Sequence, residues 1–125
     1  MGETVQLAIS DAAFRDELMR MLSASDGAEV VCVDNPDPAR SGVLVVDPEH
    51  LNRLALPLPR PERVVVVTDD SPGHMEDTLD HAWRAGVHSV VSTREPVGTA
   101  VLAVLSARLR MVKQLPSQRK ERRLP

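Results

Sequence analysis

Asp47 is the residue of this sequence best placed to do chemistry. It follows four consecutive apolar residues, Val43 to Val46, and it precedes Pro48, which has no backbone N–H to continue a strand. An apolar run without polar alternation predicts a strand that is buried on both faces, as in the centre of a parallel sheet. Open α/β sheets bind their ligands at the carboxyl ends of such strands. We therefore expect Asp47 to be the central residue of any functional site.

Polar residues also follow the other predicted strands. Strands must become polar where they reach solvent, and this explains most of these residues without any function. In a parallel sheet, however, the carboxyl ends of all strands meet at one edge, so some of these side chains should lie near Asp47. The residues predicted to form a pocket around Asp47 are Ser10, Asp11, Thr68, Thr93 and Arg94.

No other pattern predicts catalysis or a metal site, and we expect neither. Asp47 and His50 are three residues apart, but one such pair offers too few ligands for a metal, and we expect His50 to be a solvated helix residue. The sequence has no glycine-rich phosphate loop and no G-x-S-x-G motif. The single cysteine, Cys32, excludes both a disulfide framework and a cysteine-based metal cluster.

Predicted strands and helices alternate along the chain. Apolar runs predict strands at residues 5–9, 28–33, 42–46, 63–67 and 87–91. Apolar periodicity and capping residues predict helices after Asp11, at residues 49–56, around residues 75–83 and from Pro96 onward. The segment at residues 35–41 is rich in proline and too short for a full helix, so we expect a single turn or an extended crossover there. The alternation implies a parallel sheet between two layers of helices.

Apolar residues of the last two helices predict which face of each helix meets the sheet. The stripe of the helix near residue 80 is Met75, Leu79, Ala82 and Trp83. The stripe of the last helix is Val97, Val101, Val104 and Leu105, continued by Leu109 and Val112. Four further apolar residues lie outside that second stripe: Ala100, Leu102, Ala103 and Met111. They indicate either a helix with a wide buried face or an interface, and we weigh these two readings equally.

Composition and charge limit the partners. The last nine residues carry four basic side chains against one acidic side chain, and this local +3 leaves about −6 for the rest of a chain whose net charge is −3. Such a chain has no broad surface for nucleic acid, and the tail alone would bind it weakly at physiological salt. We expect a folded domain at residues 1–115 and a disordered basic tail at residues 116–125. The sequence has no signal peptide or membrane span, which predicts a cytoplasmic protein without membrane contact.

The order of elements and three short motifs resemble the receiver domain of two-component response regulators. The run ending in Asp47 looks like the family's third strand, which ends in the aspartate that accepts a phosphoryl group. Thr68 matches the Ser or Thr that senses this group, and Ala85-Gly86-Val87 resembles the A-G-A sequence before the fifth strand. The resemblance covers Val5 to Val112. It implies an α/β, receiver-like (flavodoxin-like) three-layer sandwich, with a five-stranded parallel sheet of order 2-1-3-4-5 and a second helix that is absent or very short.

The chain departs from the family at the positions that support phosphoryl transfer. The family's acidic pair, which holds Mg²⁺, falls on positions that include Ser10, and neither possible register gives two acidic residues. The family's lysine falls on Thr93, with Arg94 next to it. Phosphoryl transfer depends on metal and charge neutralisation. The resemblance therefore implies a pseudo-receiver, in which Asp47 is only a candidate phosphoacceptor.

We thus expect a non-catalytic signalling or protein-interaction module, not an enzyme, that needs no cofactor. Its expected partner is a protein, with a homodimer through the last helix as the specific prediction. One alternative is a phosphorylatable receiver that binds Mg²⁺ at Asp47, with Asp11 and Arg94 replacing the missing groups. A second alternative is a small α/β ligand-binding domain or enzyme with a pocket lined by Asp47, Thr68 and Thr93.

Overall fold

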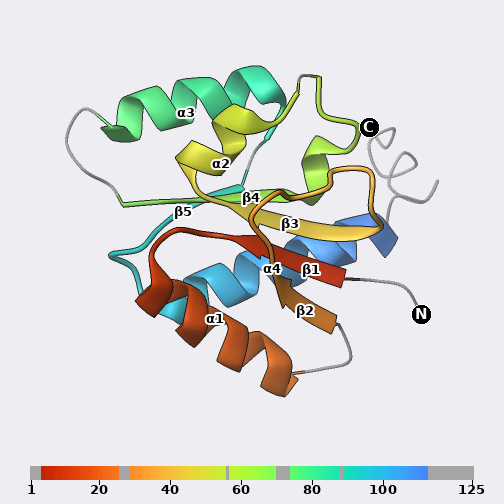
Figure 1. The fold of residues 1–125 in the computed structure, drawn as a ribbon, viewed down its shortest axis with the longest axis vertical. Helices are drawn as coiled ribbons and strands as arrows, with labels where there is room; N and C mark the ends of the chain where they lie inside the picture. The colour runs from red at the N-terminus through yellow and green to blue at the C-terminus, as the bar shows by residue number, and fades with distance from the viewer. Residues whose placement is uncertain (1–3, 26–28, 56, 70–73, 88, 113–125) are drawn as a thin grey trace, which may run out of the picture.

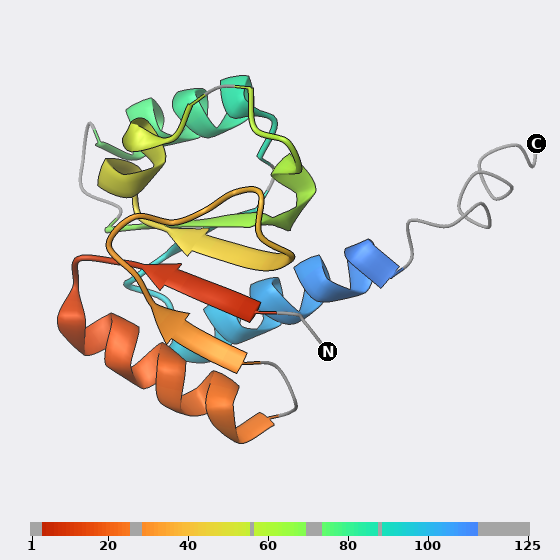
Figure 2. The ribbon, with the colours of Figure 1, turned by 45° about the vertical axis from the view of Figure 1, so that its right-hand side comes forward.

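A parallel sheet with helices on both faces forms the described part of the chain (Figures 1 and 2). The computed structural model describes residues 4–25, 29–55, 57–69, 74–87 and 89–112. Over these residues the strands are β1 (Thr4–Ala8), β2 (Glu29–Cys32), β3 (Gly42–Val46), β4 (Val64–Thr68) and β5 (Ser89–Ser92). The helices are α1 (Ala12–Ser25), α2 (Pro48–Arg53), α3 (His74–Ala85) and α4 (Val97–Val112), and a 3-10 turn, η1 (Pro61–Arg63), precedes β4. The predicted tail at residues 116–125 lies outside the described residues.

The sheet has the predicted order β2-β1-β3-β4-β5, and each neighbouring pair of strands is parallel. Ala8 of β1 is level with Val46 of β3, and Thr68 of β4 is level with Ser92 of β5. The residues that follow these strands therefore emerge at the same edge of the sheet, which is the arrangement that the sequence predicted for the neighbours of Asp47.

Two apolar cores lie on the two faces of the sheet. Val43 and Val45 of β3 belong to the core that the sheet forms with α1 and α4. Leu44 and Val46 point the other way, into the core under α2 and α3. Because alternate side chains of a strand point to opposite faces, a strand between two cores must be apolar at every position. This explains the unbroken apolar run before Asp47.

The crossover between β2 and β3 contains no helix at residues 33–41, as predicted. Gln6 of β1, only 2% exposed, holds this segment against the sheet. Its Nε2 donates to the carbonyl oxygen of Asp37 at 3.0 Å, and its Oε1 accepts from the backbone N–H of Asp37 at 2.9 Å. Gly42 then begins β3 with φ +123°, and a Cβ at this position would overlap the carbonyl of Thr4.

The buried face of α4 agrees with the predicted one at Val104, but it also includes two small residues outside the predicted stripe. Ala100, Val104 and Ala107 are at most 1% exposed and lie in the core, while Ala103 packs against it. Ala100 therefore supports the reading of a wide buried face, and it cannot form an interface, while Ala103 is only partly buried. Small side chains let α4 approach α1 and the sheet closely, whereas the prediction gave the inward positions to the larger side chains.

Other large apolar side chains are exposed on α3 and α4. Leu102 of α4 is 66% exposed, as an interface residue must be, but Leu109 is 58% exposed although its predicted position faces the sheet. On α3, Leu79 and Trp83 are 46% and 71% exposed, so the predicted stripe of that helix is wrong at both. The side chain of Met111 lies outside the described residues. No described helix has the length and apolar character needed to cross a membrane.

Candidate functional site

Asp47 is the N-cap of helix α2. It leaves β3 in an extended conformation, and its Oδ1 accepts a hydrogen bond from the backbone N–H of His50 at 2.9 Å. Pro48 occupies the first turn, where its fixed φ suits a helix and its missing N–H needs no partner. The carbonyl of Asp47 accepts the first helical bond, from Leu51 N at 2.9 Å. The sequence D-P-E-H thus changes from strand to helix within one residue.

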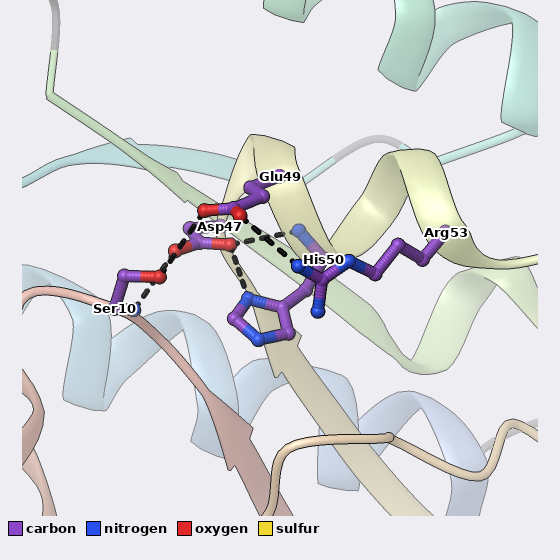
Figure 3. A network of polar contacts seen from close by, with 5 residues as sticks. All are labelled: Ser10, Asp47, Glu49, His50 and Arg53. Atoms are coloured by element: carbon purple, nitrogen blue, oxygen red, sulfur yellow. Dashed lines mark hydrogen bonds and ion pairs between the residues drawn. The ribbon is translucent and has the colours of Figure 1, made fainter.

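Further contacts of Asp47 engage both oxygens of its carboxylate (Figure 3). Its Oδ2 accepts from the backbone N–H of Ser10 at 2.8 Å, and its Oδ1 lies 2.6 Å from Nδ1 of His50. An ionised carboxylate can only accept hydrogen bonds, so Nδ1 carries the proton in this pair. The side chains of Asp47 and His50 are only 15% and 10% exposed. Three donors from the protein therefore hold one poorly solvated carboxylate.

These donors decide the charge of Asp47. Burial alone would raise the pKa of Asp47, because it disfavours the charged form. The backbone N–H groups of His50 and Ser10, together with the His50 ring, outweigh burial and hold the pKa of Asp47 below its ordinary value. The carboxylate is therefore ionised at neutral pH, and its hydrogen bonds are charge-assisted.

Sequence reasoning missed the role of His50. It is 8% exposed and bonded to Asp47, whereas the prediction placed it in solvent. The sequence signal that could have revealed this role is the spacing between His50 and Asp47. His50 is the third residue after the N-cap, and a side chain at this position can reach back to the cap, as it does in a capping box.

A cavity of about 590 Å³ opens beside Asp47 at the carboxyl edge of the sheet. The predicted pocket residues that line it, together with Asp47, are Ser10, Asp11, Thr68 and Thr93. Arg94 is exposed and is not among the described residues that line it; its backbone N–H donates to Ser92 Oγ at 3.0 Å.

A short chain of side-chain contacts continues the Asp47 network toward solvent (Figure 3). Ser10 Oγ donates to Oε1 of Glu49 at 3.4 Å, and Arg53 lies 3.0 Å from the other oxygen of Glu49. The guanidinium of Arg53 thus pairs with Glu49 on the surface, and Arg53 is not among the described residues that line the cavity. Asp11 is engaged elsewhere, since its Oδ1 accepts from Phe14 N at 3.2 Å and caps α1.

The described lining of the cavity is acidic. Its carboxylates are Asp11, Asp47, Glu49, Asp69 and Asp77. It contains no Lys or Arg, and its only imidazole is that of His81. Thr68, 1% exposed, also lines the cavity, and its Oγ1 has no hydrogen-bond partner.

The Mg²⁺ ion that the receiver fold implies does not fit these residues. Mg²⁺ requires near-octahedral oxygen ligands at close range. Within the described part of the chain, no three His, Cys, Asp or Glu side chains are grouped so that they can hold a metal. Both oxygens of Asp47 already accept hydrogen bonds from Ser10 and His50. The carboxylates of the cavity are therefore dispersed along its wall and do not form a metal site.

Comparison with known proteins identifies the fold. No protein-family model matches the sequence, and no curated protein matches it. Among solved structures, the chain is similar to the "Low Resolution Structure of Response Regulator StyR", with a TM-score of 0.59 and 21% sequence identity. The match covers 98% of this chain and 65% of that one. The chain therefore has the receiver-like, flavodoxin-like α/β fold of a response regulator.

Proposed function

We propose that this domain is a pseudo-receiver, a non-catalytic signalling module that acts through protein contacts and not through phosphoryl transfer. The observation that carries the proposal is the state of Asp47. Ser10 N occupies one of its oxygens, and His50 occupies the other twice. A carboxylate oxygen must be available to attack a phosphodonor. Attack by Oδ1 would compete with the cap of α2, and attack by Oδ2 would compete with the hydrogen bond from Ser10 N.

Charge supports the same conclusion. A phosphoryl group on Asp47 would add negative charge to a cavity whose described lining holds four other carboxylates and no Lys or Arg. Two like charges at 4 Å repel by about 1 kcal/mol in water and about 4 kcal/mol at the effective dielectric constant near a protein surface. Active phosphoryl-transfer sites neutralise this charge with metal and cationic side chains. Arg94, which the phosphorylatable alternative requires, does not line the cavity.

The exposed apolar side chains support signalling by contact. Leu102 and Leu109 are separated by two helical turns on α4, and Leu79 and Trp83 by one turn on α3. Figure 2 shows that α4 also extends beyond the sheet. Large apolar side chains exposed on one face of a helix, as Leu102 and Leu109 are, suit an interface in a small soluble domain. We propose that the domain forms a homodimer through α4.

The direct test is incubation of the purified protein with acetyl phosphate and Mg²⁺, followed by intact-mass measurement. We expect no phosphoryl adduct, whereas a response regulator with a complete acidic pair and lysine, treated in parallel, acquires one. A stoichiometric adduct that disappears in Asp47→Asn would refute the proposal. The second alternative, a ligand-binding domain, is favoured by one observation, the cavity beside Asp47.

A further inference from the structure

We propose that the basic tail at residues 116–125 docks on its own domain and covers an apolar groove between α3 and β5. The inference goes beyond the proposed function, because it concerns neither Asp47 nor the exposed side chains of α4. A phosphoryl adduct on Asp47 would therefore leave it standing. The docked tail is a regulatory contact, since it closes the groove to other proteins until one of them displaces it.

The groove lies between the second half of α3 and β5, which is the edge strand of the sheet. It has a volume of about 550 Å³, and two of its large apolar side chains, Leu79 and Trp83, are 46% and 71% exposed. Tryptophan is highly buried on average, so a groove with this composition gains free energy when it is covered. The other described residues that line it are Asp80, Ala82, Val87 and Val90.

The charge of the groove favours a basic occupant. Asp80 is the one carboxylate of the described lining, which contains no Lys or Arg. Glu76, one helical turn before Asp80, is exposed on the same helix. Arg84 pairs with Asp80 at 3.2 Å, but these side chains remain 74% and 60% exposed. An exposed ion pair of this kind is weak, so Asp80 can also pair with a cation of the occupant.

The tail supplies the groups that such a groove binds. It lies outside the described residues, and its chemistry follows from its sequence. A guanidinium of the tail can stack on the indole of Trp83 while a neighbouring cation pairs with Asp80. Leu124 adds an apolar side chain for the groove. The tail has one carboxylate, Glu121, and four cations: Arg119, Lys120, Arg122 and Arg123.

The end of α4 brings the tail within reach of the groove. Both α3 and α4 end at the edge of the sheet where the strands begin (Figures 1 and 2). The turn η1 connects them, because α4 packs against η1 and a Cβ on Gly86, just after α3, would lie 3.2 Å from Pro61 of η1. Residues 113–125 span about 40 Å when extended. A domain of this size is about 35 Å across, so the tail can reach the groove.

An intramolecular contact of this kind needs only modest affinity. A short flexible connection gives the tail an effective concentration of about 1 mM at the groove. A contact with a dissociation constant of about 1 mM for the separate peptide is then occupied about half of the time. One stacked arginine, exposed ion pairs and a covered leucine are individually weak interactions that together reach this range. The tail therefore covers the groove and can still be displaced by a protein that binds it more tightly.

The first test uses Trp83, which is the single tryptophan of the sequence, so its fluorescence reports on the groove. Acrylamide quenching of the native full chain is compared with that of the full-length double variant Arg119→Glu/Arg122→Glu, whose tail is acidic. We expect the native chain to be quenched about half as strongly, because its tail covers Trp83 about half of the time. Raising NaCl from about 50 mM to about 0.5 M should increase quenching of the native chain, because salt screens exposed charges.

The matched control is Arg20→Glu/Arg40→Glu, which reverses two exposed charges outside the tail and the groove lining. Its quenching should equal that of the native chain. Equal quenching of the native chain and the Arg119→Glu/Arg122→Glu variant would overturn the inference and leave the groove open to another protein. An equal increase in both double variants would overturn it as well, since the effect would then belong to net charge and not to the tail.

The second test locates the tail with a nitroxide label at Ser117→Cys, in a full chain in which Cys32→Ser removes the other thiol. We expect broadened amide signals at the end of α3 and in β5 when the label and ¹⁵N are on the same chain. A mixture of nitroxide-labelled chains and separate ¹⁵N-labelled chains should show no such broadening. Equal broadening in the mixture would assign the groove to the tail of a second copy, and its absence from both samples would remove the contact; either result overturns the inference.

Discussion

The carboxylate of Asp47 ties the ends of β1 and β3 together, because its Oδ2 accepts the backbone N–H of Ser10 at 2.8 Å. The two residues are 37 positions apart in sequence. The other oxygen caps α2 and binds the His50 ring. The residue that resembles a phosphoacceptor therefore has a structural role, and this role has measurable consequences.

Asp47→Ala should destabilise the protein by about 2 kcal/mol, because it removes an N-cap and leaves the N–H of Ser10 and the ring of His50 without their acceptor. Urea denaturation followed by circular dichroism measures this change. The matched control is Asp34→Ala, which removes an exposed carboxylate after β2 and should have little effect. A catalytic carboxylate that is held among other negative charges would destabilise the fold by repulsion, and its removal would relieve that repulsion. Increased stability of Asp47→Ala would therefore argue against the structural role.

The lowered pKa of Asp47 predicts an acid-dependent part of the stability. A group whose pKa is lower in the folded state stabilises the fold above its unfolded pKa, ordinarily 3.8, and this contribution is lost as the pH falls through the folded value. The difference in unfolding free energy between the native chain and Asp47→Asn should therefore be largest at neutral pH and shrink below about pH 4. Urea midpoints from pH 7 to pH 3 test this. A difference that grows toward acid pH would mean that the pKa is raised.

Gln6→Leu should destabilise the protein by about 2 kcal/mol, since it leaves the N–H and carbonyl of Asp37 without partners against an apolar sheet. Hydrogen exchange should also become faster at residues 33–41, because Gln6 holds this crossover. Asp37→Ala is the control: it keeps both backbone groups that Gln6 binds and should be milder. If the two variants unfold at the same urea concentration, the side-chain clamp is not what orders the crossover.

Thr68→Val should stabilise the free protein by about 1 kcal/mol, because it replaces a buried, unpartnered hydroxyl with a methyl group of similar size. Thermal and urea unfolding without ligand measure the effect. Thr93→Val, at a more exposed position in the same cavity, should change stability little. Destabilisation by Thr68→Val would show that its hydroxyl has a partner in the free protein.

The sequence predicted where the strands lie and where Asp47 stands because both depend on local signals, whereas the order of the strands was implied by the resemblance to receiver domains. A buried parallel strand needs an unbroken apolar run, and the D-P pair ends it. The proline-rich crossover was predicted for the same reason, since a helix needs more residues than the segment offers. Gln6, in contrast, lies inside an apolar run, and only its contact with Asp37 reveals its purpose.

The buried face of α4 was predicted only in part, because its apolar residues exceed what one face can hold. Val104 was correctly placed inward, but Leu109 was placed inward as well, whereas the helix buries Ala100 and Ala107 instead. Which stripe faces inward depends on how closely the helix approaches its neighbours, and this is a tertiary property. The role of His50 was missed for a similar reason. A histidine on a short helix is expected to be solvated unless one considers that its side chain can contact the N-cap residue, here Asp47.

The exposed stripe of α4 gives the last prediction, which concerns the proposed homodimer. Leu102→Glu and Leu109→Glu should each weaken self-association at least about tenfold, because each places a charge in an apolar contact. Light scattering across a concentration series measures this. Ala100→Glu is unsuitable, since it would bury a charge in the core. The control is Ser23→Glu, at an exposed polar position of α1 away from the stripe of Leu102 and Leu109, which should keep the mass of the native chain. A native chain that remains a monomer at every concentration would remove the dimer and leave α3 and α4 as surfaces for another protein.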